Sequence, residues 1–263
     1  ALEAALPLQS TRQRVIAYMD TVKTHDLPPH VPGYTEGEQC EGCFVVVEGL
    51  DRAGKTTLIG GLVKRLQEEG LKVHECAFPD RSAGESGHMC DMYLSKKMDP
   101  ESLDFLQVHS MFALNRREAE PSLLQRLREG YIIVCSRYAY SGVAYSMSKG
   151  THSLETLAAY DKGHLEPHQV IMLPVRVEEA EKRSGYGDEI YEQRDTQATV
   201  KRAFEAVRVY SEARAALVDD KGSRQKWADI PMGSGIQASQ DYAVSVVLDR
   251  LKRERRLHGL KWE

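Results

Sequence analysis

Short apolar runs alternate with longer amphipathic stretches along most of the chain. The runs with the composition of buried strands are 44–48, 72–78, 131–136, 169–174 and 225–230, and helical or mixed stretches separate them. Strands that alternate with helices are typical of a parallel sheet covered by helices on both faces. The pattern therefore predicts one large α/β domain built on a five-stranded parallel sheet.

Two helices are predicted from apolar residues that recur at intervals of three and four. Their apolar faces are Leu58, Leu62, Val63 and Leu66 in the helix that Gly70 ends, and Val244, Val247, Leu248 and Leu251 in the last helix. Each face is typical of a helix that packs on a sheet.

A third helix is predicted before the middle strand. Asp99 is a suitable N-cap, and Pro100 fits the first helical position. The helix should run through Asn115 and Arg116, and Pro121 should kink or restart it.

Residues 1–41 differ in character from the rest. An amphipathic piece within them precedes a proline-rich linker at 28–33. The piece carries Arg12 and Arg14, as a transit peptide would, but acidic residues flank it. We interpret residues 1–41 as an extension, with a docking helix or an expression remnant, and 42–263 as the domain.

Composition narrows the classes of function. The chain has 263 residues, a net charge of −4 and a pI near 6.2, which argues against a general nucleic-acid binder. No apolar run approaches the roughly 20 residues of a membrane span. Five cysteines are an odd set, and two lie in predicted strands, which fits a reducing compartment. We predict a cytoplasmic protein, and leave a nuclear or organellar pool open.

The first predicted strand and helix are joined by Gly49-x4-Gly54-Lys55-Thr56. This is the pattern of a P-loop in the strand-loop-helix context that a P-loop requires. Its backbone amides would surround phosphates, Lys55 would neutralise the outer ones, and the Thr56 hydroxyl would bind Mg²⁺, with Glu48 helping through a water. The predicted nucleotide-binding residues are Gly49, Arg52, Ala53, Gly54, Lys55, Thr56 and Thr57.

Basic side chains follow two other predicted strands. Arg81 and Arg137 come just after the strands at 72–78 and 131–136. Because ligands of parallel sheets bind beyond the carboxyl ends of the strands, both should reach the P-loop. Their charge exceeds what one triphosphate needs and indicates a second phosphate. The alternative is that either arginine is an ion-pair partner at the surface.

A flat base could be recognised from the third helix. Phe112, Asn115 and Arg116 are spaced at i, i+3 and i+4, which puts an aromatic ring and two polar side chains on one face. The alternative is that Phe112 is an ordinary core residue.

With these residues identified, the chain resembles thymidylate kinases of the P-loop nucleoside monophosphate kinases, most closely the eukaryotic and poxviral branch. The resemblance begins at about residue 42 and reaches the C-terminus. Five short motifs in family order carry it, at 47–56, 78–82, 112–116, 137–145 and 187–192.

The resemblance implies a P-loop NTPase fold with a short lid, and transfer of the γ-phosphoryl group of ATP to dTMP with Mg²⁺. It implies catalytic roles for Lys55, Arg52 and Asp51, of which Asp51 also meets the sugar 3′-hydroxyl. It also implies a homodimer. The substrate residues that it implies are Asp51, Phe78, Arg81, Phe112, Asn115, Arg116, Arg137, Ser141, Gly142, Tyr145 and Tyr191.

These family positions have separate roles. Arg81 and Arg137 would hold the dTMP phosphate, Phe112 would lie under thymine, and Arg116 would donate to its carbonyl edge. Tyr145 would crowd the sugar 2′ position. Tyr191 would close over the monophosphate from a lid at 183–194.

One position departs from the family pattern. Ser136 stands where the family usually has an aspartate that helps to organise magnesium. A weakly active or pseudokinase nucleotide-binding protein therefore stays open. A kinase for another pyrimidine monophosphate such as dUMP also stays open, because its base differs from thymine by one methyl group and pockets discriminate weakly against such a change. A regulatory GTPase is disfavoured, because its Asn-Lys-x-Asp motif needs an asparagine followed by lysine, and the only asparagine, Asn115, precedes Arg116.

Overall fold

The computed structural model describes residue 13 and residues 42–82, 84–97, 103–174, 194–218 and 227–257. The predicted N-terminal extension, the linker at 28–33 and the lid at 183–194 lie outside the described residues, except for residues 13 and 194.

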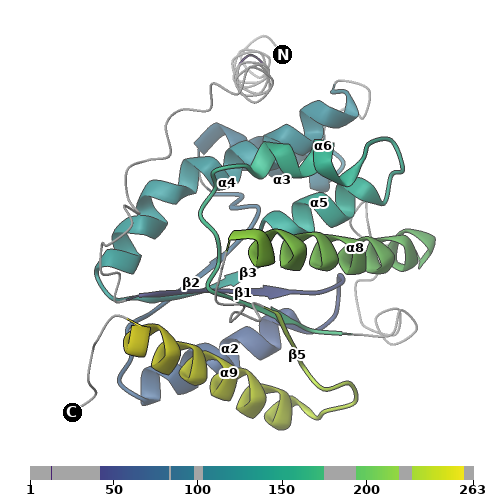
Figure 1. The fold of residues 1–263 in the computed structure, drawn as a ribbon. Helices are drawn as coiled ribbons and strands as arrows, with labels where there is room; N and C mark the ends of the chain where they lie inside the picture. The colour runs from purple at the N-terminus through teal and green to yellow at the C-terminus, as the bar shows by residue number, and fades with distance from the viewer. Residues whose placement is uncertain are drawn as a thin grey trace.

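A five-stranded parallel sheet forms the middle layer, as predicted (Figure 1). Its strands are β1 (Cys43–Glu48), β2 (Val73–Ala77), β3 (Ile132–Ser136), β4 (Gln169–Met172) and β5 (Trp227–Asp229), in the order β2-β3-β1-β4-β5. β1 is therefore central, with β3 on one side and β4 on the other. In such sheets, ligands bind beyond the carboxyl ends of the strands, at the point where the strand order reverses.

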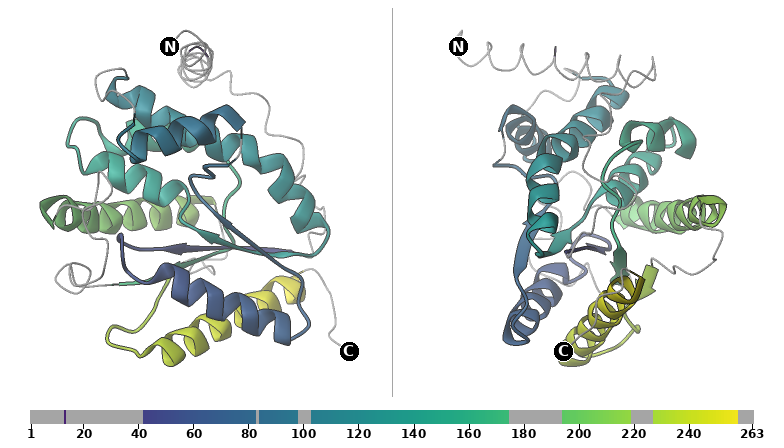
Figure 2. Two further views of the ribbon diagram at one scale, coloured as in Figure 1. Left: turned by 180° about the vertical axis from the view of Figure 1, so that it is seen from behind. Right: turned by 60° about the vertical axis from the view of Figure 1, so that its left-hand side comes forward.

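Helices cover both faces of the sheet (Figures 1 and 2). α2 (Lys55–Glu68) and α9 (Ile236–Leu257) lie on one face. The other face carries α3 (Gly84–Leu94), α4 (Phe105–Arg128), α5 (Ala139–Met147), α6 (Leu154–Ala158) with the short 3₁₀ helix η1 (Ala159–Asp161), and α8 (Arg194–Val218).

The central strand β1 is buried on both faces, which explains its continuous apolar sequence. Val45 and Val47 pack in the core formed with α2 and α9, and the predicted apolar faces of those helices lie there. Phe44 and Val46 point the opposite way, into a core shared with α4. Side chains alternate along a strand, so one run of apolar residues supplies both cores.

The prediction for α4 was wrong at its start, and the restart considered at Pro121 is not found. The helix begins at Phe105, after a capping box in which Asp104 accepts from the Gln107 amide at 2.9 Å and Gln107 accepts from the Asp104 amide at 3.0 Å. It continues through Pro121 to Arg128 without a restart. The residues after Pro121 pack leucines against the sheet, and this burial outweighs the loss of one helical hydrogen bond.

Among the described residues, no helix combines the length and the apolarity needed to cross a membrane. The four cysteines in this part of the chain, Cys43, Cys76, Cys90 and Cys135, are free thiols.

Candidate active site

The P-loop joins the buried end of β1 to the first turn of α2. Three of its residues have a positive φ, namely Gly49 at 150°, Arg52 at 59° and Gly54 at 99°. A side chain at Gly49 would place its Cβ 2.7 Å from the Leu173 carbonyl oxygen, so only glycine fits there. The loop therefore turns tightly, and the N-terminus of α2 points into the space that the loop encloses.

A cavity of about 670 Å³ opens over this loop. All the predicted nucleotide-binding residues from Arg52 to Thr57 line it, and Gly49 does not. The rest of the wall comes from the segments after β4 and β5 and from the start of α9, none of which was predicted as part of the site. It consists of Leu173, Pro174, Ile230, Pro231, Gly233, Ser234, Ile236 and Ser239.

Lys55 is folded back over the loop. Its ammonium donates to the carbonyl oxygens of Leu50 at 2.6 Å and Gly49 at 3.1 Å, and the residue is 8 % exposed. The loop backbone therefore compensates a largely buried charge. The same hydrogen bonds hold the ammonium at the P-loop, and Lys55 lines the cavity over that loop.

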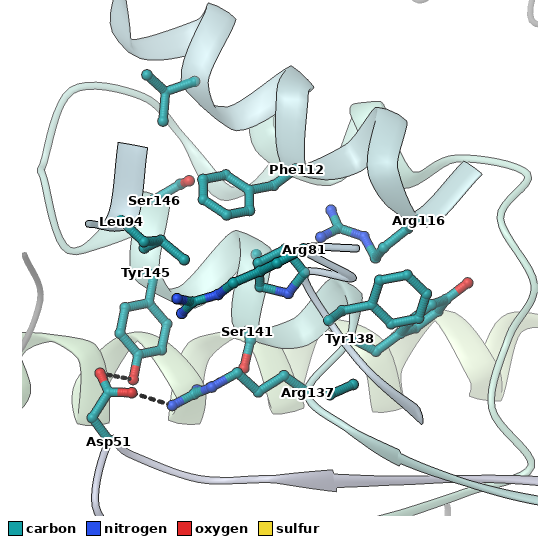
Figure 3. A pocket seen from close by; sticks show the side chains of 15 residues that line it. Asp51, Arg81, Leu94, Phe112, Arg116, Arg137, Tyr138, Ser141, Tyr145 and Ser146 are labelled. Carbon is teal, nitrogen blue, oxygen red and sulfur yellow. Dashed lines mark hydrogen bonds and ion pairs between the residues drawn. The ribbon is translucent and has the colours of Figure 1, made fainter. Parts of the chain in front are cut away.

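A second cavity, of about 220 Å³, lies between the ends of β2 and β3 and the helices α4 and α5 (Figure 3). Every predicted substrate residue lines it except Asn115 and Tyr191, and Tyr191 lies outside the described residues. The cavity also has wall residues that were not predicted as site residues: Ala77, Pro79, Leu94, Val108, Tyr138 and Ser146.

Asp51 connects the two cavities, because it belongs to the P-loop and lines the second cavity. One carboxylate oxygen accepts from Arg137, and the other accepts from Tyr145 at 2.7 Å (Figure 3). The second oxygen also accepts from Gln197 of α8 at 3.1 Å. Burial alone would raise the Asp51 pKa, but the charges of Arg137 and Lys55 and these hydrogen bonds lower it. Asp51 is thus held ionised in a defined orientation.

Arg137 brings the end of β3 onto the P-loop. Its backbone has a φ of 63°, and its guanidinium donates to the Gly49 carbonyl at 3.1 Å and to the Ser141 hydroxyl at 3.2 Å. It also lies over the Tyr145 ring, 5.1 Å from the centroid. Left-handed backbone at an arginine is uncommon and is typical of a functional site.

Arg81 lines the same cavity as Arg137, but its side chain is more exposed to solvent. Its side chain is 40 % exposed and lies 3.4 Å from the Asp91 carboxylate. Both predicted arginines line this cavity, but of the two it is Arg137 that donates a hydrogen bond to the P-loop in this structure.

Glu48, which we had considered as a water-mediated magnesium ligand, has another set of partners. Its carboxylate accepts from the backbone amides of Tyr138 at 3.0 Å and Ser141 at 3.1 Å, and from the Ser141 hydroxyl. Burial raises its pKa, and these hydrogen bonds and Arg137 oppose that effect. Glu48 thus caps the start of α5 from the neighbouring strand, and we no longer assign it to magnesium.

Asn115 does not line the second cavity, contrary to the expectation from helical spacing. Its amide oxygen accepts from the Asp80 amide at 2.8 Å, and its nitrogen donates to the Asp80 carbonyl at 3.1 Å and to Ser86 at 3.2 Å. The i+3 position points to the side of the row formed by Phe112 and Arg116. Asn115 instead holds the loop that carries Arg81.

The comparisons with known proteins agree with this geometry. A sequence model of the family described as "Thymidylate kinase" matches residues 47–226. Thymidylate kinase of Danio rerio is 40 % identical over 164 residues, covering 62 % of this chain and 76 % of that protein. The Homo sapiens thymidylate kinase is 37 % identical over 163 residues, covering 62 % and 75 %.

A solved structure is also similar. The thymidylate kinase of Candida albicans superposes with a TM-score of 0.65 at 29 % sequence identity. The match covers 80 % of this chain and 93 % of the Candida chain.

Proposed function

Because this chain belongs to the thymidylate kinase family, we propose that its P-loop cavity binds ATP and that its second cavity binds dTMP. The enzyme transfers the γ-phosphoryl group of ATP to dTMP and produces dTDP and ADP. The observation that carries the site assignment is the Asp51–Arg137 contact, since it places the wall of one cavity against the loop of the other. Two phosphates held in these cavities would meet end to end.

The dTMP phosphate would be held by Arg81 and Arg137. Guanidinium groups bind phosphate oxygens in pairs with charge-assisted hydrogen bonds. Asp51 would accept from the sugar 3′-hydroxyl, and Tyr145, whose hydroxyl already bonds Asp51, would crowd the 2′ position. Ser141, Gly142 and Phe78 also line this cavity.

The transfer itself requires positioned charge more than covalent chemistry. Lys55 and Arg52 would neutralise the charge that develops on the transferring group. The accepting phosphate is already an anion near neutral pH, so no side chain has to remove a proton from it.

Thr56 is the residue that we propose to hold Mg²⁺. Within the described ranges, no three or more His, Cys, Asp or Glu side chains form a group that could hold a metal ion. A single hydroxyl with substrate phosphates suits Mg²⁺, which keeps several waters, and Thr56 is exposed on the cavity wall. When bound, the ion would screen the phosphate charge.

Ser136→Asp tests the unusual residue at the end of β3. We expect a tighter apparent magnesium affinity or a higher turnover number, because a carboxylate is a better magnesium ligand than a hydroxyl. Steady-state rates measured across a magnesium titration check this. Ser136→Asn, which matches the shape without the charge, is the control, and equal magnesium curves for both variants would contradict the prediction.

Phe112→Ala tests the base site. The Phe112 ring lines the dTMP cavity and lies edge-on to Tyr93, with centroids 6.1 Å apart. We expect the KM for dTMP to rise about tenfold, since stacking on a base contributes roughly 1–3 kcal/mol, while the KM for ATP stays nearly constant. Steady-state kinetics with each substrate varied measures both constants.

Phe105→Ala is the matched control for this variant. Phe105 is on the same helix but stacks on His152 at 5.5 Å, away from the cavity. If both variants raise the two KM values equally, Phe112 is a core residue and not the plate under the base.

The specificity test compares dTMP, dUMP, dCMP, dGMP and UMP as acceptors with magnesium ATP. We expect dTMP to be the best and dUMP to follow, because pockets discriminate weakly against one missing methyl group. The Candida albicans enzyme is described as having broad substrate specificity, so dUMP is the important comparison. Preference for dUMP would identify a kinase for another pyrimidine, and ATP binding without any acceptor-dependent ADP release would identify a pseudokinase.

Residues 1–41 are proposed as an extension outside the kinase domain, which would span 42–263. A homodimer is proposed from the family resemblance, and a cytoplasmic location from the cysteine usage. Sedimentation of the full chain would distinguish a monomer from a dimer.

A further inference from the structure

Arg116 reaches the base end of the dTMP cavity from α4. Its guanidinium points toward Phe112 along the cavity wall (Figure 3). It passes directly over Gly142, where an added Cβ would lie 2.9 Å from both terminal nitrogens. The side chain is only 3 % exposed, so its conformation depends on its protein contacts.

Asp161, in η1, holds this guanidinium by one edge. Its carboxylate accepts from Nε of Arg116 at 2.8 Å and from a terminal nitrogen at 3.0 Å. Such a two-point contact defines the orientation of a planar guanidinium as well as its position. Asp161 is not part of the cavity wall.

The carboxylate is itself fixed. His164 Nδ1 lies 3.0 Å from it, and His109 anchors the same segment by bonding the Leu157 carbonyl through Nε2 at 2.9 Å. Burial would raise the Asp161 pKa, but the Arg116 charge and the nearby histidines lower it well below its usual range. Asp161 therefore stays ionised, and the Arg116 guanidinium keeps a charged partner.

We propose that Asp161 is a positioning residue that sets base selectivity through Arg116. The guanidinium carries only N–H donors. Asp161 holds one edge of it, so the remaining donors keep one orientation on the cavity wall. A pyrimidine base whose edge toward Arg116 carries a carbonyl oxygen accepts these hydrogen bonds. A base with an amino group at that position places a donor against a donor and is disfavoured. The inference depends on the proposed dTMP site, and it adds a residue that does not touch the substrate.

Asp161→Asn is the first test, with dTMP, dCMP and ATP each varied in steady-state assays. We expect the KM for dTMP to rise about tenfold and the dTMP over dCMP preference in kcat/KM to fall about tenfold, as for coupled residues in contact. The KM for ATP should change less than twofold. Asp161→Glu keeps the charge but moves the carboxylate by one methylene, and it should lose part of the preference.

Glu120→Gln is the matched control. Glu120 is also a buried acid on an arginine, lying 2.8 Å from Arg117 of α4, but neither residue lines the cavity. It should lower the melting temperature without changing the dTMP over dCMP preference. Equal shifts in preference for the Asp161 and Glu120 variants would overturn the proposal.

The Arg116→Ala background separates positioning from a general structural role. If Asp161 acts through Arg116, adding Asp161→Asn to Arg116→Ala should leave the KM for dTMP unchanged. A further tenfold rise would overturn the inference, as would wild-type selectivity in both Asp161→Asn and Asp161→Glu. Absence of dTMP phosphorylation in the unaltered enzyme would instead contradict the proposed function.

Discussion

Lys55→Ala is expected to lower kcat by about 10²–10³-fold, the usual cost of removing one preorganised charge partner from a transition state. The ammonium is already held at the P-loop by the Gly49 and Leu50 carbonyls. It therefore needs little rearrangement to meet the phosphates of ATP. Single-turnover rates with saturating ATP and dTMP measure the effect on the transfer step.

The fold should survive this substitution. Lys55 opens α2, where alanine is a good helix former. Of the two loop carbonyls that lose a hydrogen bond, that of Gly49 keeps Arg137 as a donor. Lys64→Ala in the same helix is the control, because that side chain is 77 % exposed and pairs only with Glu68 across the surface at 3.9 Å. A Lys55→Ala enzyme as fast as Lys64→Ala would remove Lys55 from the mechanism.

Arg137→Ala is expected to lower kcat/KM for dTMP by about 10²–10³-fold and the free energy of unfolding by about 3 kcal/mol. Both effects come from the loss of one side chain, which has two roles. The guanidinium is a proposed phosphate ligand, and it also compensates the largely buried carboxylate of Asp51. Kinetics with dTMP varied and urea unfolding measure the two losses separately.

Two further variants separate charge from geometry at this position. Arg137→Lys keeps a cation near Asp51 but lacks the planar fork, so stability should recover more than dTMP binding. Arg81→Ala removes the exposed arginine, which should weaken dTMP binding and leave stability within about 0.5 kcal/mol. If Arg137→Ala kept a wild-type KM for dTMP, the proposed phosphate clamp would be wrong.

Local patterns predicted the elements that carry the site. The glycines and Lys55 predicted the P-loop between a buried strand and a helix, and both elements are found there. The spacing of Phe112 and Arg116 predicted a shared helix face, and both line one cavity. These predictions succeed because backbone preference and side-chain periodicity act over a few residues.

Predictions that needed a partner from another segment were less successful. Asn115 shares the predicted face by spacing, but the backbone of Asp80 takes up its amide. Asp104 replaces Asp99 as the cap of α4, because its side chain meets Gln107 three residues later. Asp161 and Gln197 have no motif of their own, and their roles become visible only where they meet Arg116 and Asp51.

The sequence by itself determined the class of fold, the phosphate-binding loop and the residues that follow the strands, because each depends on neighbours within a few positions. Only the tertiary structure decided the strand order and which charges meet. The order β2-β3-β1-β4-β5 places Arg137 on Gly49, 88 positions away in the chain. Such pairings depend on the order of the strands in the sheet. Several strand orders are compatible with one succession of strands and helices along the chain, and the packing of the core selects among them.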